Sequence, residues 1–144
     1  MKRVTIYTDG ACRGNPGAGG WAAVLEYNGV KKEIYGKDKN TTNNKMELTA
    51  VLKALSILKE PCNVELYSDS KYFCDSIIKG WAKNWQKNGW RKPDGKKALN
   101  IDLWEEILHL ILKHNVNIHW VKGHAGNKNN ERCDFLATNA AGKI

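Results

Sequence analysis

The chain has 144 residues, of which 42 % are hydrophobic and 26 % are charged, and it carries a formal net charge of +8 with a pI near 9.3. This length and composition suit one globular domain, 1–144, with a sizeable buried core, and they exclude disordered and fibrous classes. The excess of positive charge is the unusual property, and it favours a polyanionic partner.

The first third of the chain is predicted to consist of strands. Val4–Thr8 alternates and is rich in residues that favour strands, so a strand is expected there. Asp9 then begins a glycine-dense loop that continues through Gly20. Next, Trp21–Tyr27 and Lys31–Tyr35 flank an Asn-Gly pair, which predicts a hairpin.

Helices and strands alternate in the rest of the chain. Apolar residues at helical spacing from Asn44 onward predict a first helix, which Pro61 ends. The order of elements predicts an α/β fold with a five-stranded mixed sheet flanked by helices. The remaining predicted elements are a strand at Val64–Ser68, a short helix at Tyr72–Ile78, a helix around Leu103–Ile111, a strand at Val116–Val121 and a terminal helix around Cys133–Ala140.

A basic segment with interleaved tryptophans follows the short helix. Between Lys79 and Lys97 it holds seven basic residues and one acid, Asp94, and its turn-forming residues predict a protruding loop. Cations mixed with tryptophans suit a phosphate backbone with flat sugar or base surfaces. Alternatively, the segment is a solvated, lysine-rich helix in which Trp81 and Trp85, four residues apart, face the core.

The four cysteines form no CxxC pair and show no spacing typical of a zinc site, so we assign them no metal and expect a reduced, cytoplasmic environment. The N-terminal residues lack the apolar run of a signal peptide, and no segment reaches the length of a membrane helix. We therefore expect no membrane association, and we expect a monomer without an obligate protein partner.

Four acids are candidates for one shared site. Asp9 and Asp69 follow predicted strands, whereas Glu47 and Asp134 are expected in the first turns of helices. Each also has an ordinary explanation as a turn residue, an N-cap, a capping box with Asn44 or a complement to a helix dipole. Because α/β sheets gather ligands at strand ends, the acids are expected to be neighbours. Clustered carboxylates need a cation, and oxygen ligands favour Mg²⁺ or Mn²⁺ over zinc.

Such a site could hydrolyse a phosphodiester. Two ions roughly 3.5 to 4 Å apart can activate a water on one side and stabilise the leaving oxygen on the other. His124, in the loop before the terminal helix, could move protons, or it could be a solvated loop residue. The glycine-dense loop matches neither a P-loop nor a dinucleotide fingerprint, and close approach to a ligand or a plain turn explains it equally well.

Five ordered blocks of sequence resemble the bacterial ribonuclease HI family, that is, type 1 ribonuclease H, and they span nearly the whole chain. The resemblance implies a ribonuclease H-like fold with a basic handle protrusion. It also implies endonucleolytic hydrolysis of the RNA strand of RNA·DNA hybrids by a two-metal-ion mechanism with Mg²⁺, for which Mn²⁺ could substitute, leaving 5′-phosphate and 3′-hydroxyl ends. The blocks are Tyr7–Gly10 with Gly14–Gly17, Thr41–Leu48, Ser68–Ser70, Trp120–Gly126 and Asn130–Asp134.

The resemblance also assigns roles to individual residues. It implies that Asp9, Glu47, Asp69 and Asp134 bind metal and that His124 is a catalytic histidine. The implied substrate-binding residues are Cys12, Asn15, Asn43 and Asn44 in the minor groove of the hybrid, Thr42 and Asn100 at a DNA-strand phosphate, and Trp81, Lys83, Trp85, Lys87, Trp90, Arg91 and Lys92 in the handle, Trp81–Lys97.

The chain departs from the family pattern at two positions. Asn40 stands where the phosphate pocket often has an arginine, and Lys71 stands where a glutamine is common. We expect Lys39 or Lys71 to supply the phosphate contact instead, because both lie close to these positions in sequence.

Two other functions remain open from the sequence. A transposase or junction nuclease on a similar fold would also gather acids at strand ends, but it would cut plain duplex DNA. A non-catalytic hybrid-binding module would require the acids to be helix caps and turn residues only.

Overall fold

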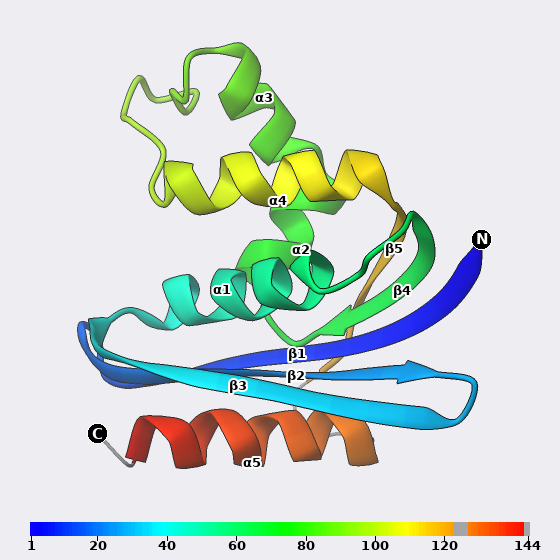
Figure 1. The fold of residues 1–144 in the computed structure, drawn as a ribbon. Helices are drawn as coiled ribbons and strands as arrows, with labels where there is room; N and C mark the ends of the chain where they lie inside the picture. The colour runs from blue at the N-terminus through cyan, green and yellow to red at the C-terminus, as the bar shows by residue number, and fades with distance from the viewer. Residues whose placement is uncertain (123–126, 143–144) are drawn as a thin grey trace.

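The computed structural model describes residues 1–122 and 127–142, which form one sheet with helices on both faces (Figure 1). The order across the sheet is β3-β2-β1-β4-β5. β2 runs antiparallel to its neighbours β1 and β3, whereas β4 and β5 run parallel to β1. The predicted five-stranded mixed sheet is therefore confirmed. The strands are β1 (Lys2–Gly14), β2 (Gly17–Tyr27), β3 (Val30–Thr41), β4 (Cys62–Ser68) and β5 (Asn115–Trp120).

Five helices surround this sheet. One face of β1 and β2 is covered by α1 and the opposite face by α5, while α4 packs on α1 (Figure 1). α3 lies beyond α4, at the greatest distance from the sheet (Figure 1). No helix in the described ranges is long and apolar enough to cross a membrane. The helices are α1 (Asn43–Ser56), α2 (Lys71–Ile78), α3 (Trp81–Lys87), α4 (Ile101–Lys113) and α5 (Lys128–Gly142).

The main core lies between the sheet and the helices α1, α2 and α4. Its largest fully buried side chain is Trp104 on α4, whose ring packs against those of Tyr72, Phe73 and Trp85. The indole Nε1 of Trp104 donates a hydrogen bond to the hydroxyl of Tyr72 at 2.9 Å, so the polar atom of this large ring is satisfied. A second, smaller cluster under α5 consists of Ala22, Val24, Cys133, Leu136 and Ala137.

The glycine-dense stretch is not the loop that the sequence predicted. β1 and β2 both extend into it and leave a two-residue turn between them. Close packing by helices requires glycine here. A Cβ on Gly10 would lie 2.5 Å from the main-chain nitrogen of Glu47, and one on Gly20 would lie 2.2 Å from the main-chain oxygen of Ala137. These two glycines therefore let α1 and α5 approach opposite faces of the sheet.

Two other predicted boundaries were wrong by several residues. β3 continues to Thr41 instead of ending at Tyr35, and α5 begins at Lys128 instead of near Cys133. The added residues are mostly polar, so they carry no apolar periodicity that would indicate an element. Main-chain hydrogen bonding to β2 extends β3 instead.

Candidate active site

The register of β1 and β4 places Asp9 beside Asp69. The two strands are parallel neighbours, and their pairing ends with Thr8 opposite Ser68. Asp9 follows Thr8 and Asp69 follows Ser68, so both carboxylates lie at the same edge of the sheet, the one at the carboxyl ends of its parallel strands.

Two helices bring the other acids to this edge from opposite faces. α1 crosses β1 at Gly10, and one carboxylate oxygen from each of Asp9, Glu47 and Asp69 lies within 4.8 Å of the others. From α5, the carboxyl of Asp134 lies near enough to Asp9 to contribute to raising the pKa of Asp9. Asp134 lies in the second turn of α5 rather than in its first, because the helix begins earlier than predicted. We call these four residues the acid cluster.

The helix caps rule out two of the local explanations for the acids. α1 is capped by Thr42, whose hydroxyl accepts a hydrogen bond from the main chain of the third helical residue. Glu47 consequently lies in the second turn and forms no capping box with Asn44. α2 is capped by Ser70 rather than by Asp69.

Burial and mutual repulsion hold protons on the acid cluster. Burial and then the charge of Asp69 raise the pKa of Asp9 to about 8, against a hydrogen bond of 2.9 Å that Oδ1 accepts from the main-chain nitrogen of Gly10. Burial, followed by the charges of Asp9 and Asp69, raises the pKa of Glu47 well above its ordinary value. Full ionisation at neutral pH therefore requires a positive charge within the cluster.

The donor atoms fit a hard divalent cation. Oε2 of Glu47 is buried and accepts no hydrogen bond from the described residues, although a buried carboxylate oxygen is costly without a cation, a proton or a donor. Nearby, Sγ of Cys133 donates to the carbonyl of Tyr7 at 3.2 Å, and burial raises the pKa of this thiol to about 12. This thiol is engaged by a main-chain carbonyl, whereas the clustered donor atoms are the carboxylate oxygens of Asp9, Glu47 and Asp69, which would suit Mg²⁺ or Mn²⁺ rather than zinc.

The residues that the resemblance assigns to the minor groove lie together at the start of α1. Oδ1 of Asn15 accepts a hydrogen bond from the main chain of Asn43 at 3.1 Å. Sγ of Cys12 donates to the carbonyl of Thr41 at 3.4 Å, and Asn44 lies in the first turn of α1. The structure thus groups these side chains on the surface next to Glu47.

A cavity of about 750 Å³ lies between the start of α1 and the start of α4. Asn100 lines it with a left-handed backbone (φ 60°), and its side chain makes no capping bond to α4. Thr42 follows the lining residue Thr41. Sequence reasoning missed Lys45 and Lys97, which also line the cavity. Lys45 belongs to the block Thr41–Leu48 and Lys97 to the handle, but only the fold brings them together.

The two lysines that we expected to replace the missing arginine, Lys39 and Lys71, are not among the described residues that line this cavity. Lys71 begins α2, and its Nζ lies 5.9 Å from the centroid of the Trp120 ring. Lys45 and Lys97 are the two cations among the described residues that line the cavity, and the phosphate contact of Lys39 or Lys71 stays a prediction.

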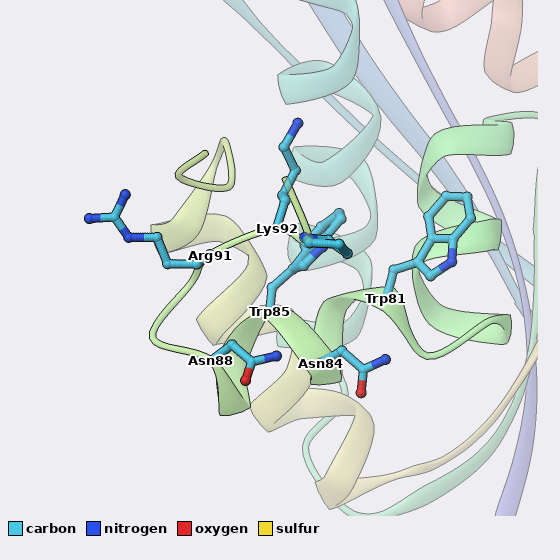
Figure 2. A pocket seen from close by; sticks show the side chains of 7 residues that line it. Trp81, Asn84, Trp85, Asn88, Arg91 and Lys92 are labelled. Atoms are coloured by element: carbon cyan, nitrogen blue, oxygen red, sulfur yellow. The ribbon is translucent and has the colours of Figure 1, made fainter. Parts of the chain in front are cut away.

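The handle contains a pocket of about 510 Å³ (Figure 2). Trp85 projects into its centre, with Trp81 on one side and Arg91 pointing away on the other (Figure 2). Trp85 is only 9 % exposed and its ring packs edge-on against Trp104, as the core interpretation expected, whereas Trp81 is 41 % exposed. The lining residues are Trp81, Asn84, Trp85, Asn88, Arg91, Lys92 and Pro93.

The remaining handle residues are placed by local contacts. Trp90 is half-buried, and its main-chain nitrogen donates to the carbonyl of Trp85 at 2.6 Å. Lys83, Lys87 and Arg91 are exposed, so their charges face solvent. Lys83 and Lys87 belong to α3, which lies at the far end of the molecule from α5 (Figure 1). His124, the predicted catalytic histidine, lies outside the described residues.

Comparisons with known proteins identify close relatives. The family model described as RNase H matches residues 1–142. Ribonuclease H of Chlorobium phaeobacteroides (strain BS1) is 57 % identical over 140 residues, which cover 97 % of this chain and 96 % of that protein. Ribonuclease H of Chelativorans sp. (strain BNC1) is 55 % identical over 137 residues, which cover 95 % and 84 %.

Solved structures share the fold. LC9-RNase H1, described as a type 1 RNase H with the type 2 active-site motif, matches with a TM-score of 0.87 and 32 % identity over 99 % of this chain and 74 % of that chain. LC11-RNase H1, solved in complex with an RNA/DNA hybrid, matches with a TM-score of 0.74 and 25 % identity over 97 % of each chain.

Proposed function

The chain belongs to the RNase H family of nucleases, and from this premise we propose that it hydrolyses the RNA strand of RNA·DNA hybrids with two Mg²⁺ ions at the acid cluster. The proposal rests on one observation: carboxylate oxygens of Asp9, Glu47 and Asp69 lie within 4.8 Å of one another, and Oε2 of Glu47 is buried. The hybrid bound to LC11-RNase H1 supports the choice of substrate.

The carboxylates would hold the metal from three directions. β1 supplies Asp9 and the residue after β4 supplies Asp69, both at the sheet edge, while α1 supplies Glu47 from one face and α5 supplies Asp134 from the other. When bound, two divalent ions would neutralise these charges, activate the attacking water and stabilise the leaving 3′-oxygen, which gives 5′-phosphate and 3′-hydroxyl ends.

Protons must leave the acid cluster before all of its carboxylates can bind a cation. Because the pKa of Asp9 is about 8, this carboxyl holds a proton during much of the time at neutral pH and releases it on metal binding. We propose that His124 moves a proton to or from the reacting oxygens, since a free imidazole titrates near neutral pH.

Two surfaces outside the acid cluster would select the substrate. The amides of Asn15, Asn43 and Asn44 would meet the minor groove, where 2′-hydroxyls distinguish RNA from DNA. The exposed cations of the handle would contact the backbone of the hybrid. The monomeric state, the single domain and the cytoplasmic location stay predictions.

The test is cleavage of end-labelled substrates with and without Mg²⁺. The wild type should cut the RNA strand of a hybrid and leave duplex DNA and duplex RNA intact. Asp69→Asn should keep hybrid affinity but reduce turnover at least about 100-fold, because a neutral amide is a poor metal ligand. Asp75→Asn, a matched change on α2 outside the acid cluster, should cleave normally.

Each rival function predicts a different result. Cutting of plain duplex DNA would favour a transposase-like or junction-resolving nuclease. Hybrid binding without cleavage by the wild type would favour a non-catalytic binding module. Full turnover by Asp69→Asn would contradict the metal assignment.

A further inference from the structure

Trp120, the last residue of β5, lies at the sheet edge that carries the acid cluster. Its partner in the register between β4 and β5 is Ser68, the residue before Asp69. β5 is the outermost strand in the order across the sheet, and Trp120 is 50 % exposed. Large aromatic residues are usually buried more fully, so packing in a core does not explain the position of this ring.

The indole of Trp120 holds the main chain of a proposed metal ligand. Its Nε1 donates a hydrogen bond to the carbonyl of Asp69 at 3.3 Å, and the main-chain nitrogen of Val121 donates to the carbonyl of Ser68 at 2.9 Å. The end of β5 thus holds two successive carbonyls of the connection between β4 and α2. Fixing these peptide planes limits the rotation of the backbone that aims the Asp69 carboxylate.

The same ring also contacts the residue that begins α2. Nζ of Lys71 lies 5.9 Å from the ring centroid, within the range of a cation–π interaction. The Trp120 side chain therefore contacts the chain at two points that flank Ser70, the cap of α2. The connection that carries Asp69 is fixed by β4 on one side, by α2 on the other and by the indole between them.

We propose that Trp120 is a positioning residue, which orients Asp69 for metal binding without being a ligand itself. The inference rests on the proposed metal site. It predicts that loss of the indole N–H weakens metal binding while leaving contacts to the hybrid unchanged. One exposed hydrogen bond contributes modestly, so the expected loss in metal affinity is between about 2-fold and 10-fold.

The test measures Mn²⁺ binding to the protein alone by calorimetry. Trp120→Phe keeps an aromatic face for Lys71 but has no N–H, and it should bind Mn²⁺ about 2-fold to 10-fold more weakly than the wild type. Trp81→Phe is the matched control, because Trp81 is similarly exposed and has Nζ of Lys79 5.2 Å from its ring centroid. It should bind Mn²⁺ like the wild type.

A further variant separates the hydrogen bond from the cation. Lys71→Met removes a positive charge near the acid cluster but keeps the indole, so it should not weaken Mn²⁺ binding. In cleavage assays, Trp120→Phe should need a proportionally higher Mg²⁺ concentration for half-maximal rate, with the KM for hybrid unchanged. A higher KM at saturating Mg²⁺ would overturn the positioning role and indicate a substrate contact instead.

The outcome stays interpretable if the phenylalanine variant does not fold. Benzothienylalanine at position 120 keeps the shape of the indole and replaces its N–H with sulfur, and it should weaken Mn²⁺ binding by the same factor. Wild-type affinity in either folded variant would overturn the proposal. Equal Mn²⁺ affinity of the wild type and Asp69→Asn would instead remove Asp69 as a ligand and overturn both the proposed metal site and this inference.

Discussion

Replacing Gly10 with alanine should separate α1 from β1 and disturb the acid cluster. A Cβ at this position would lie 2.5 Å from the main-chain nitrogen of Glu47 and 2.6 Å from the main-chain carbon of Met46. Both are backbone atoms, so no side-chain rotation relieves the clash. Restoring ordinary contact near 3.4 Å requires the helix and the strand to separate by about 1 Å.

The cost can be worked from this displacement. Overpacking in a core costs about 1 to 3 kcal/mol, and replacing glycine in a strand returns up to about 1 kcal/mol of backbone entropy. The net cost spans up to about 3 kcal/mol, and from the middle of this span we expect the free energy of unfolding to fall by about 1 to 2 kcal/mol, which lowers Tm by about 2 to 8 °C in a domain of this size. A shift of about 1 Å in Glu47 should reduce turnover by up to about 100-fold.

Urea denaturation, Mn²⁺ calorimetry and hybrid cleavage would measure these three effects. Gly29→Ala is the control, since Gly29 has φ +79° but nothing within 4 Å of an added Cβ. It should lose about 1 kcal/mol through backbone strain and leave Mn²⁺ affinity and turnover unchanged. If Gly10→Ala is as stable as the wild type and binds Mn²⁺ equally well, the close approach of α1 to β1 is not the reason for glycine at this position.

Three further predictions concern charge. In metal-free protein, the folded pKa of Asp9 is about 8, above its ordinary 3.8, so wild-type stability is lost as pH rises through that interval. Asp9→Asn should therefore raise the free energy of unfolding at pH 8.5 by several kcal/mol in urea titrations with a chelator, since each pH unit of the shift corresponds to about 1.4 kcal/mol, and saturating Mg²⁺ should cancel this gain. For His114, burial and then the charge of Lys113 lower the pKa, and Nδ1 accepts a hydrogen bond from the main chain of Cys62 at 3.0 Å. The stability from neutral His114 is present above pH 6.5 and lost as pH falls below it, so His114→Gln should show a smaller stability difference between pH 7.5 and pH 5.5 than the wild type, and an equal difference would refute this assignment. In the handle, neutralising four cations should reduce the slope of log affinity for hybrid against log salt by up to about 3 to 4, and an unchanged slope would mean that these side chains are only solvated. The four substitutions, made together, are Lys83→Ala, Lys87→Ala, Arg91→Ala and Lys92→Ala.

The sequence predicted elements well where periodicity was strong. Val4–Thr8 and the helix from Asn44 carry apolar residues at the spacing of their elements, and both elements form. Prediction failed at the glycine-dense stretch because glycine is required there by the close packing of α1 and α5, which are distant in sequence. Local rules treated the same glycines as turn residues.

The helix ends show the same limit. Thr42 and Asn44 are both acceptable caps by composition, and only the backbone geometry selects Thr42. Polar residues from Lys128 onward gave no periodic signal, so the start of α5 and the position of Asp134 within it were misjudged.

By itself, the sequence determined the identity of the acids, the excess of positive charge and the family, because residue types and ordered blocks are properties of the chain alone. The tertiary structure decided which of these residues meet. Strand register placed Asp9 beside Asp69, and helix packing on opposite faces brought Glu47 and Asp134 to the same edge. It also placed Lys45 and Lys97 in the lining of one cavity and brought the indole of Trp120 within hydrogen-bond distance of the Asp69 carbonyl. Such contacts join residues far apart in sequence, so they arise only when the core closes around the sheet.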